Sequence, residues 1–344
     1  MNAAAEAFVP PSPVRRPVRF GVIGCSSIVP RALLEPARYV EHSTVVAVAN
    51  RTVTKAHLMA EQYGIGTVHQ TPAELLNDSE VDAVYIALSN ELHAEWIAKA
   101  LKAGKHVLVE KPLCLYTDEL DLIESALRAG GPCLLEGVMV RHHPWQDKLR
   151  TMVSDPSFGR LRSIETSLCI PAKNGHKDNY RSRLEQGGGC FRDLGVYWLQ
   201  FLQTLVGLDG AGFQGQSSFD GPDGCDWTFE AQAEYPDGLR AAVLCSFERP
   251  YHCSHTLTFD DAVVSLNDCF RANLGFYKMT LRIHRSDGLS AKSEFGPMNY
   301  YVNQLDCFCR IIRGMAAPVP FRESAERIRL LDSIYQSARQ IRVK

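Results

Sequence analysis

Residues 18–28 read VRFGVIGCSSI, an apolar run that ends in a glycine and continues into small polar residues. A strand that turns sharply into a helix has this pattern, and backbone N–H groups at such a turn can bind a pyrophosphate. Gly24 supplies the turn, whereas Ser26 and Val29 stand where the second and third glycines of a G-x-G-x-x-G fingerprint would be. An ordinary turn between a strand and a helix is the alternative. The cofactor-binding residues predicted here are Gly21, Gly24, Ser26, Ser27 and Ile28.

Around this stretch, short β-branched runs alternate with helix-like segments as far as residue 137. The expected strands are 18–23, 44–49, 83–88, 106–109 and 133–135. The expected helices are 54–63, 72–76, 91–102 and 117–129. Strands that alternate with helices of this length indicate βαβ units in an α/β domain with a parallel, doubly wound sheet.

Beyond residue 137 the strand-like runs follow one another directly, at 161–170, 228–235, 239–247, 255–266 and 277–284. Helical segments are expected only at 189–205 and 323–340. This pattern predicts an α+β domain with an open, mainly antiparallel sheet. We therefore divide the chain into a flexible, proline-rich leader (1–17), a first domain (18–137) and a second domain (138–344).

Composition excludes several classes of protein. The 344 residues carry 37 Lys and Arg against 39 Asp and Glu, so no net positive charge is present to hold nucleic acid. The 11 cysteines are scattered without a C-x-x-C pair, and the nearest approaches to a zinc signature, Cys253 with His255 and Cys307 with Cys309, lack a second pair; no metal is expected. No run approaches the roughly 18 apolar residues of a membrane span, so no membrane is expected. The apolar run 20–24 after Arg15 and Arg16 is too short for a signal peptide, so a cytoplasmic location is expected.

The end of the second expected strand bears on the cofactor. An acidic residue there would hydrogen-bond the ribose hydroxyls of NAD, but this chain has Asn50 and Arg51. A guanidinium in place of a carboxylate favours a 2′-phosphate, and we therefore predict that NADP(H) binds here, with Asn50 and Arg51 among its contacts. A solvated turn arginine is the alternative for Arg51.

Two further motifs lie at the ends of later strands. Residues 88–93 read LSNELH, and residues 104–112 read GKHVLVEKP. A strand that ends in Glu-Lys-Pro after an Asn-x-x-His turn resembles the Gfo/Idh/MocA family of nicotinamide-dependent sugar and polyol oxidoreductases. The resemblance covers the chain from residue 18 and implies a Rossmann domain, a second α/β domain with an open sheet, and an active site between them. It adds Leu88, Asn90, His93, Glu110 and Lys111 to the expected cofactor contacts.

Residues 187–197, GGGCFRDLGVY, form the second motif of the family. Many relatives carry a histidine where this chain has Tyr197, so the resemblance is to the tyrosine branch, which uses a Lys and Tyr pair. Asp193 and Tyr197 are four residues apart and share one helical face. The predicted catalytic residues are Lys111, Tyr197 and Asp193. Core aromatic packing of Tyr197 and an exposed Lys111 are the alternatives, and His93, His142 and His143 are read as structural or cofactor-lining.

In this hypothesis Tyr197 protonates the oxygen of a ketone as hydride arrives, Lys111 lowers the pKa of Tyr197 and anchors the same oxygen, and Asp193 orients a neighbouring hydroxyl. The regions around residues 92–96, 142–144 and 170–181 look like those of nucleotide-sugar 3-ketoreductases. The predicted substrate-binding residues are Lys111, Lys173, Arg181, Asp193 and Tyr197. The basic side chains of residues 173–183 are candidates for a diphosphate, or belong to a solvated loop.

The resulting prediction is an NADPH-dependent reductase for a keto-sugar, with a nucleotide-linked 3-keto-deoxysugar as the narrower candidate. An NADP-dependent dehydrogenase of a free aldose or cyclic diol is one alternative. A non-catalytic NADP-binding regulator is another, although such a protein could dispense with the Lys and Tyr pair. A homodimer or homotetramer is expected.

Overall fold

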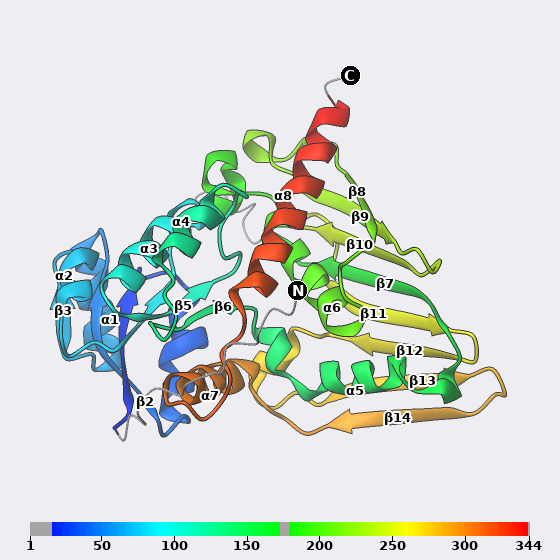
Figure 1. Ribbon diagram of the computed structural model, residues 1–344, viewed down its shortest axis with the longest axis horizontal. Coiled ribbons are helices and arrows are strands. Elements are labelled where there is room, and N and C mark those ends of the chain that lie inside the picture. Colours follow the sequence, from blue (N-terminus) through cyan, green and yellow to red (C-terminus); the bar gives the residue numbers. More distant parts are fainter. Residues whose placement is uncertain (1–15, 173–178, 343–344) are drawn as a thin grey trace, which may run out of the picture.

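The computed structural model describes residues 16–172 and 179–342. These residues form a six-stranded sheet and an eight-stranded sheet that lie side by side, with the long helix α8 (Phe321–Arg342) between them (Figure 1). The predicted α/β class with a second, mainly antiparallel domain is confirmed. Almost all of the predicted leader, 1–17, lies outside the described residues.

The first sheet has the strand order of a Rossmann domain, β3-β2-β1-β4-β5-β6, and its pairings are parallel. Its strands are β1 (Val18–Ile23), β2 (Ser43–Ala49), β3 (Thr67–His69), β4 (Ala83–Ile86), β5 (His106–Glu110) and β6 (Leu134–Gly137). Its helices are α1 (Val53–Tyr63), α2 (Pro72–Asn77), α3 (His93–Lys102) and α4 (Glu119–Ala126). The short strand β3 and the helical turns after β1, η1 (Pro30–Leu34) and η2 (Pro36–Arg38), were not predicted.

Buried side chains cover both faces of this sheet, which explains its almost continuous apolar strands. On one face, Phe20 packs on Phe308 of α7 (Tyr300–Ile312), with the ring centroids 6.1 Å apart. On the other face, Ile328 of α8 joins the core made by α2, α3 and α4. Two helices from the end of the chain therefore complete the core of the first sheet.

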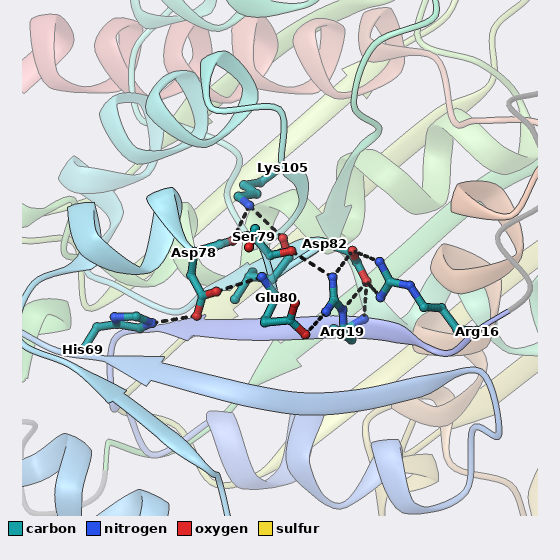
Figure 2. A network of polar contacts seen from close by, with 9 residues as sticks. Arg16, Arg19, His69, Asp78, Ser79, Glu80, Asp82 and Lys105 are labelled. Atoms are coloured by element: carbon teal, nitrogen blue, oxygen red, sulfur yellow. Dashed lines mark hydrogen bonds and ion pairs between the residues drawn. The ribbon is translucent and has the colours of Figure 1, made fainter.

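A polar network ties the amino ends of three strands together (Figure 2). Asp82 precedes β4 and accepts hydrogen bonds from the backbone and side chain of Arg19, at 3.0 and 3.1 Å. Arg16 donates to both oxygens of Asp82 at 2.9 and 3.0 Å. Lys105, before β5, donates to the carbonyls of Asp78 and Val81 at 2.6 and 2.8 Å. The network holds the amino ends of β1, β4 and β5 together. In sheets of this kind, ligands bind at the opposite edge, where the carboxyl ends of the strands lie.

The second sheet has the order β14-β13-β12-β11-β7-β10-β9-β8, with only β7 and β10 parallel among its pairings. Its strands are β7 (Leu161–Cys169), β8 (Gly212–Gln216), β9 (Thr228–Glu234), β10 (Arg240–Ser246), β11 (His252–Phe259), β12 (Ala262–Asn267), β13 (Met279–Arg285) and β14 (Ser290–Phe295). Along β9 buried and exposed residues alternate, so one face of the sheet packs on the core and the other faces solvent.

Helices α5 (Pro144–Val153), α6 (Val196–Leu205) and α8 cover the buried face of this sheet (Figure 1). One predicted strand was wrong: the run 255–266 is two strands, β11 and β12, joined at Asp260 and Asp261. Helices α5 and α7 and strands β8 and β14 were not predicted. Among the described residues, no helix is long and apolar enough to span a membrane.

Candidate active site

The turn after β1 has the backbone of a dinucleotide-binding loop. Gly24 has φ +97°, and a Cβ placed on it would lie 2.5 Å from the carbonyl oxygen of Ala87, so only glycine fits. Ser26 Oγ is buried at this turn and has no hydrogen-bond partner. An orphaned hydroxyl and a glycine-restricted turn at the carboxyl end of β1 fit a bound dinucleotide.

Gly21 does not belong to this turn. It lies buried within β1, and a Cβ there would come within 2.7 Å of Leu75 Cδ2 in α2. Close packing between the sheet and α2 explains this glycine, so its position does not support the predicted cofactor contact. Ser27 is exposed and Ile28 is half-buried at the start of the following helical turn.

The end of β2 carries Asn50 and Arg51 next to that turn. Asn50 Oδ1 accepts a hydrogen bond from Cys25 N at 3.1 Å, and its amide donates to the carbonyl of Thr52 at 3.0 Å. Asn50 therefore fixes the loop, while the side chain of Arg51 is exposed. Lys55, which the sequence reasoning missed, lies on the first turn of α1 and close enough to Cys25 to affect the pKa of its thiol electrostatically.

His93 and Asn90 hold the turns after β4 and β5. The ring of His93 is fully buried, with Nδ1 2.8 Å from the carbonyl of Pro112 and Nε2 3.3 Å from that of Leu88. Burial lowers the pKa of His93, which favours a neutral ring that cannot serve as an acid. Asn90 Nδ2 donates to the carbonyl of Gly187 at 3.1 Å and so joins the two predicted motifs.

Lys111 and Asp193 form a buried ion pair at the carboxyl end of β5. Lys111 Nζ donates to Asp193 Oδ1 at 2.5 Å and to the Asp193 carbonyl at 2.9 Å. Arg181 donates two hydrogen bonds to the same carboxylate, from Nε to Oδ2 at 2.9 Å and from Nη2 to Oδ1 at 3.0 Å. Burial alone would raise the pKa of Asp193, but Arg181 and Lys111 hold it well below its usual range. Asp193 is therefore ionised at neutral pH.

Tyr197 lies directly beside this pair. The ammonium of Lys111 is 5.2 Å from the centroid of its ring, and its hydroxyl donates to Met139 Sδ at 3.4 Å. Burial, followed by the charges and phenols around it, raises the pKa of Tyr197 well above 10.0. The net shift is therefore upward and opposite to the expected lowering by Lys111, because burial is the largest cause. The phenol keeps its proton at neutral pH.

Glu110 and Tyr301 complete the buried cluster. Tyr85 donates a short hydrogen bond to Glu110 Oε1, and burial raises the pKa of Glu110. Tyr301 of α7 interacts electrostatically with Glu110, Asp193 and Tyr197. The sequence reasoning missed Tyr301 because it did not predict α7; a Tyr-Tyr pair after Asn299 was the available signal.

Four other predicted residues are paired within the protein, stay neutral or lie outside the described residues. Lys173 is not among the described residues. The guanidinium of Arg181 forms an ion pair with Asp193, so it is not a free cation of the kind predicted for a diphosphate. Burial lowers the pKa values of His142 and His143 to about 4, and both stay neutral.

Comparison with known proteins identifies the family. Residues 18–136 match an oxidoreductase family with an NAD-binding Rossmann fold, and residues 147–288 match the GFO/IDH/MocA C-terminal domain. The dTDP-3,4-didehydro-2,6-dideoxy-alpha-D-glucose 3-reductase of Streptomyces violaceoruber is 32% identical over 274 residues, 79% of each chain. The chain belongs to the Gfo/Idh/MocA family of oxidoreductases. The predicted resemblance is confirmed, and this member of the family is an NAD(P)-dependent oxidoreductase.

Two other Gfo/Idh/MocA relatives match almost the whole chain. The D-xylose 1-dehydrogenase (NADP(+)) 2 of Haloferax volcanii is 28% identical over 321 residues, which are 93% of this chain and 97% of the relative. The solved structure of KijD10, a 3-ketoreductase from Actinomadura kijaniata in complex with NADP and TDP-benzene, is 27% identical with a TM-score of 0.85. That match covers 94% of this chain and 98% of KijD10.

Proposed function

We propose that this chain uses NADPH to reduce the keto group of a sugar, and that its substrate is a nucleotide-linked 3-keto-deoxysugar. The observation that carries the proposal is the buried cluster at the carboxyl edge of the first sheet, where the ammonium of Lys111 lies over the ring of Tyr197 and bonds to Asp193. The similarity to 3-ketoreductases along most of the chain supports the substrate class.

The chain's own residues supply a proton and a cation. NADPH, when bound, would supply the hydride for the carbonyl carbon of the substrate, whose oxygen would take the electrons of the carbon–oxygen π bond. Within the described part of the chain, the hydroxyl of Tyr197 donates only to the thioether of Met139, a weak acceptor, so we assign its proton to the oxygen of the substrate. The tyrosinate then recovers a proton from water. General acid catalysis of this kind contributes roughly 10²–10⁴-fold to the rate.

Lys111 has three N–H donors and uses two of them on Asp193. We assign the third to the reacting oxygen, where a positive charge stabilises the developing alkoxide. Each Asp193 oxygen already accepts a hydrogen bond, so we assign Asp193 to holding Lys111 in place rather than to the orienting role toward a substrate hydroxyl that the sequence suggested.

For the cofactor, we assign the β1 turn to the pyrophosphate and Arg51 to the 2′-phosphate of NADP, with Lys55 as a second cation on the same side. Asn50 contributes through the loop that it fixes. We assign Leu88, Asn90, His93 and Glu110 to shaping the site, since each of them hydrogen-bonds to another protein group. We keep 18–137 as the NADP-binding domain and 138–344 as the substrate-binding and oligomerisation domain.

A second candidate is an NADP-dependent aldose dehydrogenase, which the full-length similarity to the Haloferax volcanii enzyme favours. In that direction Tyr197 must act as a base, and its raised pKa opposes this role at neutral pH. We therefore rank the reductase first.

Pairing of two copies through the solvent-facing side of the eight-stranded sheet is our proposal for a homodimer or homotetramer. The unpaired state of all 11 cysteines supports a cytoplasmic location.

A substrate comparison tests the proposal. NADPH oxidation is measured with dTDP-linked 3-keto-2,6-dideoxyhexose, and NADP reduction is measured with free xylose and with a cyclic diol. We expect the highest kcat/KM with the nucleotide-linked ketone. A higher kcat/KM with xylose establishes the dehydrogenase instead, and NADPH binding without turnover on any of these compounds supports the regulator.

A further inference from the structure

The helical segment that carries Asp193 and Tyr197 starts without a cap of its own. It comprises the π-helical turn η9 (Phe191–Gly195) and α6, and the residue before it, Cys190, makes no side-chain cap to the helix. The first N–H groups of a helix have no partner within it and must find one elsewhere. Here the N–H groups of Cys190 and Phe191 both donate to one residue that is distant in the sequence.

That residue is Asp226, in the loop before β9. Its carboxylate oxygen Oδ2 accepts a hydrogen bond from Phe191 N at 2.7 Å, and its carbonyl accepts one from Cys190 N at 2.9 Å. The thiol of Cys190 donates to the same Oδ2 at 3.2 Å. Asp226 therefore caps the helical segment across the tertiary structure.

Asp226 is well placed to fix the segment because it is itself fixed. Its relative exposure is 0%, and it is followed by Trp227, whose carbonyl accepts a hydrogen bond from Phe247 N at 2.8 Å. The third glycine of the motif is explained by the same contact. Gly189 has φ +107°, and a Cβ there would lie 1.8 Å from Asp226 Oδ1. Glycine at this position lets the carboxylate reach the helix.

We propose that Asp226 is a positioning residue, which sets where Asp193 and Tyr197 stand relative to Lys111. Asp193 lies two residues after the capped N–H of Phe191, so fraying of this turn displaces Asp193 first. A displaced Asp193 would no longer hold the ammonium of Lys111. The hydroxyl of Tyr197 would then also lie at a different position relative to Lys111. The inference rests on the proposed function for its catalytic consequence, but the cap itself does not depend on the identity of the substrate.

The test compares Asp226→Ala with Asp226→Asn, which keeps an acceptor oxygen for Phe191 N. The matched control is Asp237→Ala at the other end of β9, where Asp237 Oδ1 also accepts a backbone hydrogen bond, from Leu239 N at 3.1 Å. For Asp226→Ala we expect kcat to fall by at least about tenfold while KM and NADPH affinity stay unchanged. Asp226→Asn restores most of the kcat, and Asp237→Ala resembles the wild type.

Hydrogen exchange gives a second measurement that needs no substrate. In Asp226→Ala, amides of residues 190–197 should exchange about 2–30-fold faster, the effect of a lost helix cap, whereas the first sheet is unaffected. If Asp226→Ala does not fold, Gly189→Ala takes its place in both measurements, because the added Cβ would displace the Asp226 carboxylate. Unchanged exchange at 190–197, or equal kcat in Asp226→Ala and the wild type, overturns the inference. Inactivity of the wild type on every sugar refutes only the proposed function.

Discussion

Replacing Asp193 by asparagine is the perturbation for which the structure gives the clearest expectation. Asp193 is buried and receives hydrogen bonds from Lys111 and from two nitrogens of Arg181. Asparagine keeps the size of the side chain but removes its charge. The buried ammonium of Lys111 and the half-buried guanidinium of Arg181 then lose the carboxylate that both of them contact.

Breaking a buried ion pair by removing one partner costs roughly 3–5 kcal/mol, because the other charge stays buried without compensation. We expect the free energy of unfolding of Asp193→Asn to fall by about that amount at neutral pH. The pKa of Asp193 is lowered, so its stabilising effect is present above its ordinary value of 3.8 and is lost as pH falls through the lower value in the fold. The difference between the two proteins should therefore shrink in acid.

Urea unfolding at neutral and acidic pH measures this difference. The matched control is Asp237→Asn, since Asp237 lies 3.4 Å from Arg160 in an exposed pair that contributes no more than about 1 kcal/mol. Asp193→Asn should also lose turnover while it retains NADPH binding, because its carboxylate holds Lys111. Equal destabilisation by the two variants, or a difference that does not change with pH, would refute the electrostatic reasoning.

Three further predictions follow from other parts of the molecule. Arg51→Ala should reduce the preference for NADPH over NADH by about 10- to 100-fold, the effect of one charge-assisted hydrogen bond; unchanged ratios of kcat/KM would show that Arg51 is only solvated. Gly24→Ala forces a side chain to φ +97° and into the carbonyl of Ala87, so thermal unfolding and NADPH titration should both show losses, and wild-type values would contradict the turn geometry. Burial raises the pKa of Asp226 to about 6, so the stability of the wild type relative to Asp226→Asn should decline by about 3 kcal/mol as pH rises from 3.8 through 6, and a flat difference in urea would contradict it.

The sequence predicted the first sheet well because its strands alternate with amphipathic helices and end at readable turns. The run 18–23 matches β1 residue for residue. The helices α5 and α7 were missed because their apolar residues pack on elements far away in the chain, as Phe308 does on Phe20. The division of 255–266 into two strands depends on a turn at Asp260 and Asp261, which carries neither glycine nor proline.

The sequence was sufficient to predict which residues form the candidate site, but not which of them hydrogen-bond to one another. Lys111, Asp193 and Tyr197 are brought together as expected, since each stands in a motif with a recognisable spacing. The pairing of Arg181 with Asp193 depends on how the 179–187 segment folds back onto the helical turn, and local sequence does not encode that contact. The cap from Asp226 joins residues 35 apart in the chain and has no sequence signature.

The central claim is that the phenol of Tyr197 donates the proton while hydride reaches the substrate. The single-turnover rate of NADPH oxidation by Tyr197→Phe tests it most directly. Tyr235→Phe is the control, because that phenol donates a hydrogen bond to the carbonyl of Gly207, at 2.8 Å, away from the cluster. We predict a rate lower than the wild-type rate by roughly 10²–10⁴-fold at unchanged NADPH affinity, and wild-type behaviour in the control. A wild-type rate in Tyr197→Phe would contradict the claim.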